Sequence, residues 1–144
     1  MSKILLINGS PNEKGCTYTA LAEIAATLHE QGVETEMIWL GKKPVQDCIA
    51  CHSCMKTGRC VFADIVNETA DKLAAADGLV VGSQYWNQVH GFTPDEVRKD
   101  LEGLQTMRTL ARNIAWITKC IEAGRQAGID YPTHEPVTMT NFID

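Results

Sequence analysis

The sequence has no excess of basic residues and no long apolar run. Its 144 residues include 13 lysines and arginines against 18 aspartates and glutamates, which gives a net charge of −5. A chain of this charge is not expected to take nucleic acid or an anionic membrane as its main partner. No stretch is long enough to span a membrane, and the apolar run after Met-Ser-Lys is too short for a secretory signal. We therefore expect a cytoplasmic protein.

The sequence also lacks the signatures of several enzyme classes. It contains neither the G-x-G-x-x-G dinucleotide pattern nor the Walker phosphate pattern. No serine or cysteine nucleophile with a nearby base stands out, and no pair of carboxylates typical of glycoside hydrolases does either. We therefore predict no catalytic side chain. Repeats and low-complexity tracts are absent, so one domain over residues 1–144 is the simplest organisation.

What the sequence does contain is an alternation of apolar runs and amphipathic segments. Continuous apolar runs at 3–8 and 78–82 are typical of strands buried on both faces of a parallel sheet, and residues 33–40 alternate as a further strand. Helices are predicted between these strands at about 17–31 and 64–76. This order of strands and helices indicates an α/β fold with a parallel sheet.

The last third of the chain predicts one long helix and an arm. Thr93, Pro94 and Glu96 form a helix-start signal, so a long amphipathic helix is expected over 93–124. The residues 128–144, with two prolines, are predicted to form an extended C-terminal arm. The apolar face of the long helix is expected to consist of Val97, Leu101, Leu104, Leu110, Ile114, Ile117 and Ile121.

A loop rich in turn residues, at 9–15, joins the first strand to the first helix. Backbone amides at a helix start, together with the partial positive charge of that end, can hold a phosphate group. Ser10, Asn12, Thr17 and Thr19 supply short hydrogen-bonding side chains at this place. The same residues also fit an ordinary strand-to-helix turn, and both interpretations stay open.

Four cysteines in the segment 47–61 follow the spacing C-x2-C-x2-C-x5-C. They are Cys48, Cys51, Cys54 and Cys60. Thiolates select iron–sulfur clusters and zinc over hard cations, and the compact spacing suits a 4Fe-4S cluster. Free or redox-active thiols, zinc, and haem through the Cys-x-x-Cys-His pattern are the alternatives. On the long helix, Trp116 is expected to lie in the core or at an interface, and Cys120 is expected to pack against apolar neighbours.

Several stretches resemble one known family. Lys-Ile-Leu-Leu-Ile-Asn-Gly-Ser-Pro-Asn…Gly-Cys-Thr resembles the first strand and phosphate loop of flavodoxin-like NADPH-dependent FMN reductases. Cys-Ile-Ala-Cys…Cys…Gly-Arg-Cys-Val resembles the branch that includes the iron–sulfur flavoproteins, and Ala-Ala-Asp-Gly-Leu-Val-Val-Gly-Ser and Ser-Gln-Tyr-Trp-Asn-Gln-Val-His-Gly also fit. The resemblance implies a flavodoxin-like parallel sheet with flanking helices and a bound FMN. The flavin contacts that it implies are Ser10, Asn12, Gly15, Cys16, Thr17, Ser83, Tyr85 and Trp86.

The resemblance also implies a function, which is electron transfer through FMN. NADPH or a ferredoxin-type donor would reduce the flavin, and a cluster on the cysteine segment would pass single electrons onward. Position 16 is usually asparagine in such loops, whereas this chain has a cysteine. A non-catalytic oligomeric remnant, or a metal-binding module that has lost its flavin pocket, is the alternative function.

One part of the family pattern is missing. Such proteins usually carry about two more strands with their helices, whereas here Gly82-Ser83 continues directly into Gln84-Tyr85-Trp86. The sheet is therefore expected to be shortened to about three strands, with the third strand at an unpaired edge. We expect a homo-oligomer that pairs this edge or exchanges the C-terminal helix between subunits.

Overall fold

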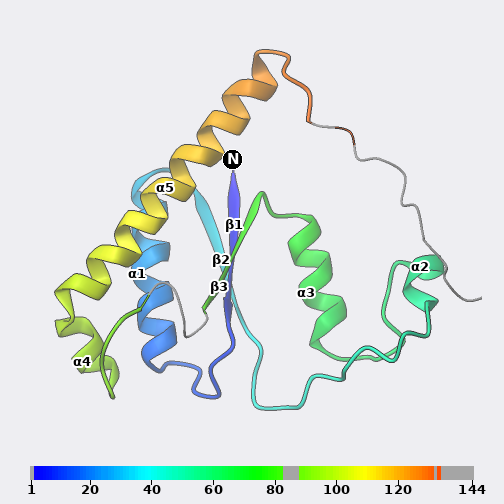
Figure 1. The fold of residues 1–144 in the computed structure, drawn as a ribbon, viewed down its shortest axis with the longest axis horizontal. Helices are drawn as coiled ribbons and strands as arrows, with labels where there is room; N and C mark the ends of the chain where they lie inside the picture. Colours follow the sequence, from blue (N-terminus) through cyan, green and yellow to red (C-terminus); the bar gives the residue numbers. More distant parts are fainter. Residues whose placement is uncertain (1, 83–87, 132, 134–144) are drawn as a thin grey trace, which may run out of the picture.

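A computed structural model of the chain describes residues 2–82, 88–131 and 133. Three strands form one parallel sheet with the order β2-β1-β3 (Figure 1). The strands are β1 (Lys3–Asn8), β2 (Glu34–Trp39) and β3 (Gly78–Gly82). This order is the one with which a flavodoxin-like doubly wound sheet begins, so the predicted α/β class and the shortened sheet are confirmed.

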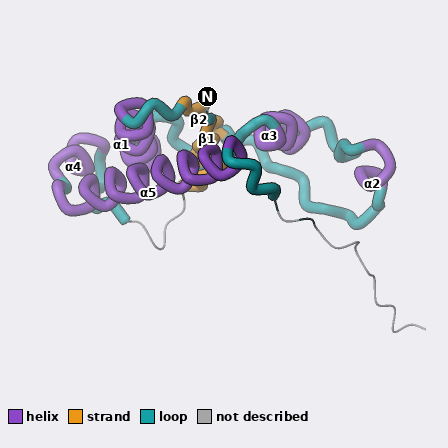
Figure 2. The backbone as a smooth tube through the Cα atoms, turned by 90° about the horizontal axis from the view of Figure 1, so that it is seen from above, coloured by secondary structure: helices purple, strands orange, loops and turns teal. Residues whose placement is uncertain are grey.

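Helices lie on both sides of the sheet. They are α1 (Cys16–Glu30), α2 (Ser53–Thr57), α3 (Ile65–Ala74), α4 (Pro94–Lys99) and α5 (Leu101–Gln126). Viewed from above, α1, α4 and α5 lie on one side of the sheet, which we call the first side (Figure 2). Helix α3 lies on the opposite, second side, and α2 projects beyond it within the cysteine loop (Figure 2).

The central strand divides its side chains between the two sides because successive residues of a strand point in opposite directions. Ile4 and Leu6 face the first side, in a core shared with α1 and α5. Leu5 and Ile7 face the second side, where the buried cluster includes few other residues. The same strand therefore supports a large core on one face and a small core on the other.

The predicted long C-terminal helix is two helices, which meet at Asp100. The capping box between Thr93 and Glu96 begins α4 as predicted. Asp100 then ends α4 and accepts a hydrogen bond from the Gly103 amide at 3.0 Å, so its carboxylate caps α5. An N-terminal cap inside a continuous apolar pattern starts a new helix, because the capping residue itself has non-helical backbone angles.

The apolar face predicted for this region is partly wrong. Leu101 is 74 % exposed, and Ile117 and Ile121 are also exposed. The residues of α5 that are buried are Gly103, Leu104, Met107, Ala111, Ala115 and Thr118. Two of these are alanines, whose short side chains bring α5 close to α1, and that is the reason why they line the contact in place of larger residues.

The C-terminal half of α5 and the residues after it also differ from the prediction. Trp116 is 68 % exposed and Cys120 is exposed, so neither lies in the core, and the packing predicted for Cys120 is wrong. An interface position for Trp116 stays a prediction. Residues 128–131 form neither helix nor strand, and most of the predicted arm lies outside the described residues. No helix in the described part of the chain is long and apolar enough to cross a membrane.

Candidate functional site

The loop after β1 is shaped by Asn8, which is fully buried at the carboxyl end of the strand. Its side-chain amide donates to the Glu13 carbonyl at 2.9 Å, and its side-chain oxygen accepts from the Ser10 amide at 3.0 Å. The Ser10 hydroxyl in turn accepts from the Asn12 amide at 3.2 Å. The role of Asn8 in shaping this loop was not predicted from the sequence, although a polar residue at the end of a buried strand is a signal for it.

The loop leads into an N-terminus of α1 that no side chain caps. Gly15 is the capping residue and has no side chain to offer, and the first turn contains no acidic residue. The first amides of a helix have no partner within the helix, and that end carries a partial positive charge. Cys16 and Thr17 are half-buried in this turn. The arrangement suits an anion that accepts hydrogen bonds from backbone amides.

Two neighbours hold the loop from outside. The Trp39 indole N–H, at the end of β2, donates to the Ser10 carbonyl at 2.8 Å. The Cys16 thiol donates to the Gly91 carbonyl at 3.5 Å, which joins the start of α1 to the segment before α4. Five predicted flavin contacts are thus gathered at the carboxyl edge of the sheet. The other three, Ser83, Tyr85 and Trp86, lie outside the described residues.

The segment between Gly91 and α5 carries one clear electrostatic feature. Asp100 accepts hydrogen bonds from the backbone amides of Gly103 and His90, and these bonds hold the pKa of its carboxyl below the ordinary value. The His90 ring lies 3.3 Å from the same carboxylate. The carboxylate therefore links the chain after β3 to the first turn of α5.

The cysteine loop extends away from the sheet on the second side (Figure 1). It contains α2, which the sequence analysis did not predict, and two residues with left-handed backbone angles, Ala50 and His52. All four cysteines have free thiols; Cys60 is half-buried and the other three are exposed. Their placement leaves the thiols accessible to an ion or cluster from solvent.

The described residues do not include a formed metal site. No group of three or more His, Cys, Asp or Glu side chains among them is arranged to hold a metal ion. The donor set itself, four free thiols in one exposed loop, is chemically suited to iron or zinc. The assignment of Cys48, Cys51, Cys54 and Cys60 as ligands therefore stays a prediction.

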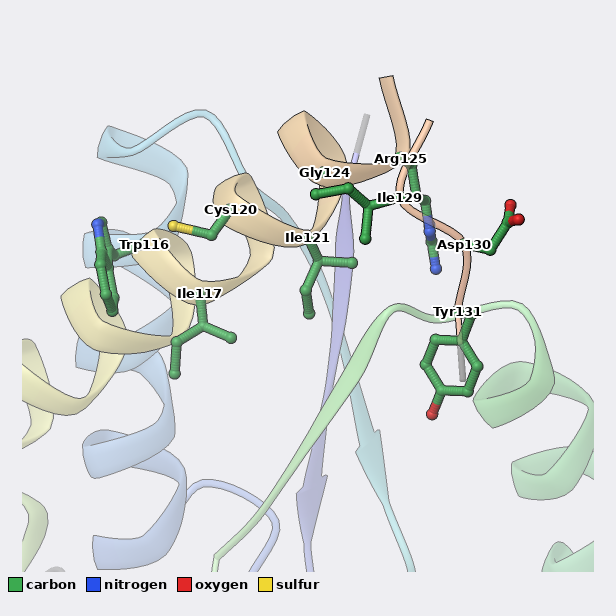
Figure 3. A pocket seen from close by; sticks show the side chains of 9 residues that line it. All are labelled: Trp116, Ile117, Cys120, Ile121, Gly124, Arg125, Ile129, Asp130 and Tyr131. Carbon is green, nitrogen blue, oxygen red and sulfur yellow. The ribbon is translucent and has the colours of Figure 1, made fainter. Parts of the chain in front are cut away.

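An apolar hollow of about 500 Å³ lies on the far half of α5 (Figure 3). This half of α5 lies at the opposite end of the molecule from the loop between β1 and α1 (Figure 1). The hollow is lined by Trp116, Ile117, Cys120, Ile121, Gly124, Arg125, Ile129, Asp130 and Tyr131. This position separates it from the predicted flavin contacts. The exposed Trp116 and Cys120 noted above belong to it, which explains why they are not part of the core.

Comparison with known families shows to which family the chain belongs. Residues 2–90 match the profile of NADPH-dependent FMN reductase, so the match includes all three strands and the cysteine loop. The chain belongs to the NADPH-dependent FMN reductase family. The matched residues include the three strands and the loop between β1 and α1. The resemblance found in the sequence is thereby confirmed.

Within the FMN reductase family, the chain is similar to archaeal proteins that are named iron–sulfur flavoproteins. One from Methanocaldococcus jannaschii is 38 % identical over 81 residues, which are 56 % of this chain and 42 % of the relative. Another from Methanosarcina thermophila is 31 % identical over 81 residues, with the same coverage. The matches therefore span less than half the length of these relatives. No solved structure matches the chain significantly.

Proposed function

We propose that the chain binds FMN at the loop between β1 and α1 and transfers electrons through it. The observation that supports this best is the uncapped N-terminus of α1 at the carboxyl edge of the sheet, in a chain of the FMN reductase family. Ligands of open α/β sheets bind at this edge, and phosphates bind at helix N-termini. A bound FMN would supply the redox chemistry, exchanging electrons in pairs with NADPH or singly with a ferredoxin-type donor.

The residues present fit a phosphate monoester. Ser10 and Thr17 carry hydroxyls, and the amides of the first turn of α1 face no carboxylate of that turn. Cys16, where such loops usually have asparagine, directs its thiol to the Gly91 carbonyl. Its contribution to phosphate binding is therefore expected to come from its backbone amide. Asn12 is exposed and its backbone closes the loop, so its side chain remains available to the ligand.

The test is the affinity for FMN of the full chain carrying Thr17→Val. Loss of one hydrogen bond to a charged group should weaken binding about tenfold or more. Quenching of flavin fluorescence measures this. The matched control is Thr106→Val, on the exposed side of α5, where the hydroxyl donates only to the Glu102 carbonyl. Equal FMN affinity in the Thr17 variant and the unaltered chain would contradict the loop assignment.

We further propose that Cys48, Cys51, Cys54 and Cys60 hold a 4Fe-4S cluster. Support comes from the similar proteins named iron–sulfur flavoproteins and from the four free thiols on one loop. Such thiols are compatible with a reducing compartment such as the cytoplasm. Iron and sulfide assays with an anaerobic absorption spectrum test the proposal. Protein that remains colourless after reconstitution with ferrous iron and sulfide would contradict it.

A homo-oligomer is the partner that we propose for the sheet. No strand among the described residues pairs with the outer edge of β3, and Leu79 and Val81 on that strand are 41 % and 53 % exposed. Unpaired edges readily accept another strand. A remnant without flavin is the second candidate function, because Gly82-Ser83 continues directly into Gln84-Tyr85-Trp86 where the family usually has further strands. Sedimentation velocity, followed at the flavin absorption band, distinguishes an oligomeric flavoprotein from both a monomer and a flavin-free oligomer.

A further inference from the structure

One face of α3 is bound to the cysteine loop through polar side chains. Asp64, the capping residue of α3, is followed at intervals of three and four by Asn67 and Asp71. Residues at these intervals lie on the same face of a helix. Each of the three forms a hydrogen bond or ion pair with the segment 46–62, which contains all four thiols.

The contact at Cys60 is the most complete of these. The Asn67 side-chain oxygen accepts from the Cys60 amide at 2.8 Å, and the Asn67 side-chain NH₂ donates to the Cys60 carbonyl at 3.1 Å. The same NH₂ donates to the Phe62 carbonyl at 3.1 Å. One carboxamide thus binds both backbone groups of the one half-buried cysteine of the loop. Only a side chain with donor and acceptor on one carbon can do this.

The other two residues hold further points of the loop. The Asp64 carboxylate accepts from the Val66 amide at 3.0 Å and from the Gln46 amide at 3.2 Å, so the cap of α3 also binds the chain before the first thiol. Asp71 forms an ion pair of 3.0 Å with Arg59. The two ends of the cysteine loop are therefore brought together on the same face of α3.

We propose that this face of α3 is a positioning surface for the thiol ligands, with Asn67 as its central residue. By fixing the backbone at Cys60 and joining the ends of the loop, it lowers the conformational freedom that four thiols lose when they close on one centre. This inference rests on the proposed metal-binding function of the loop. It assigns to Asn67 no contact with the metal, only control of where the Cys60 sulfur lies.

The experiment titrates the full-length, reduced chain with Co²⁺ under anaerobic conditions. Sulfur-to-cobalt charge-transfer absorption reports thiolate ligation directly, independently of flavin and of activity. Asn67→Ala should weaken Co²⁺ binding by about 10–100-fold, the range seen when a residue that orients a ligand is removed. The absorption per bound cobalt should also fall by about a quarter, because one thiolate of four is no longer held. A residue that only stabilised the fold would leave that absorption unchanged.

Glu68→Gln is the matched control. Glu68 is the neighbour of Asn67 on α3, is exposed, and pairs with Lys72 at 2.7 Å; Lys72 also pairs with Glu36 of β2. It should bind Co²⁺ like the unaltered chain. A second measurement needs no metal: iodoacetamide should alkylate Cys60 several-fold faster in the Asn67 variant, whereas the rate at Cys120 should stay unchanged.

The outcomes distinguish the positioning role of Asn67 from the existence of the thiol centre. Equal Co²⁺ affinity and equal absorption in the Asn67 variant and the unaltered chain would overturn the positioning role while leaving the thiol centre intact. Failure of the unaltered chain to bind Co²⁺ through thiolates would overturn a single-ion thiolate centre and the positioning role with it; the 4Fe-4S cluster, in which each iron takes one thiolate, is decided by the reconstitution with iron and sulfide. A weaker and less absorbing complex in the Asn67 variant alone supports both.

Discussion

The two sides of the sheet are stabilised by different interactions. On the first side, β1 packs against α1 and α5 in a core whose buried members are Ile4, Leu6, Ala20, Leu21, Ile24, Leu28, Val33, Met107, Ala111 and Ala115. On the second side the buried cluster is only Leu5, Ile7 and Ile38, with a few partly buried neighbours. Polar contacts take a larger share there, notably those of Glu36 with Lys3 and Lys72.

This difference separates the two candidate sites. The loop between β1 and α1, the proposed FMN phosphate site, is attached to the side that buries most apolar surface, and it is therefore expected to keep its shape without a ligand. The cysteine loop is attached to the side held by hydrogen bonds and ion pairs, which contribute less each and respond to pH and salt.

The largest effect on stability is expected when one core residue on each side of the sheet is replaced by alanine. Leu28→Ala removes a fully buried side chain of α1 and should lower the free energy of unfolding by about 2–5 kcal/mol. Ile65→Ala removes a partly buried side chain of α3 and should cost about 1–2 kcal/mol. Urea unfolding followed by circular dichroism measures both values. Equal losses would show that the second core is as well packed as the first.

A smaller effect is expected at the corner between α4 and α5. A β-carbon at Gly103 would lie 2.2 Å from an Asp100 carboxylate oxygen and 2.8 Å from the Val89 α-carbon. Gly103→Ala should therefore destabilise the first side by about 1–3 kcal/mol through overpacking. Gly124→Ala, in the same helix, meets nothing closer than 3.9 Å and should be neutral or stabilising. Equal changes in the melting temperatures of the two variants would contradict tight packing around Gly103.

The smallest expected effect is on pH dependence. Hydrogen bonds from Lys3 and then Lys72 hold the pKa of Glu36 below its ordinary value of 4.5. The stabilisation is therefore present above that pH and is lost as the pH falls through the lower pKa of the folded state. For a partly exposed pair it amounts to less than about 1 kcal/mol. Glu36→Gln should flatten the unfolding free energy between about pH 5 and pH 3; an unchanged slope would show that the carboxylate contributes nothing.

Regular elements with a clear apolar period could be predicted from the sequence. The strands β1 and β3 have the predicted bounds, and α1 and α3 differ from theirs by a residue or two. The burial of β3 could not be predicted, because a continuous apolar run indicates cover on both faces whereas the second side leaves Leu79 and Val81 exposed. Cover depends on the rest of the fold, which no single run specifies.

The candidate sites were predictable in part for the same reason. The sequence indicated the loop after β1 and the four cysteines as candidates, because turn residues and thiols are recognisable without a structure; their roles stay predictions. It missed Asn8 and Asn67, whose role depends on backbone groups that only folding brings within reach. It also missed the break at Asp100, because the amide of His90, which shares that carboxylate, is supplied by the loop before α4.

The close approach of the loop before α4 to the start of α1 restricts how this protein can evolve. Gly91 is exposed, yet a β-carbon there would lie 2.6 Å from the Val97 amide nitrogen, and its carbonyl accepts the Cys16 thiol. A substitution at this surface position would thus disturb the start of α1, 75 residues earlier in the chain. In related chains, substitutions at positions 16 and 91 are expected to covary.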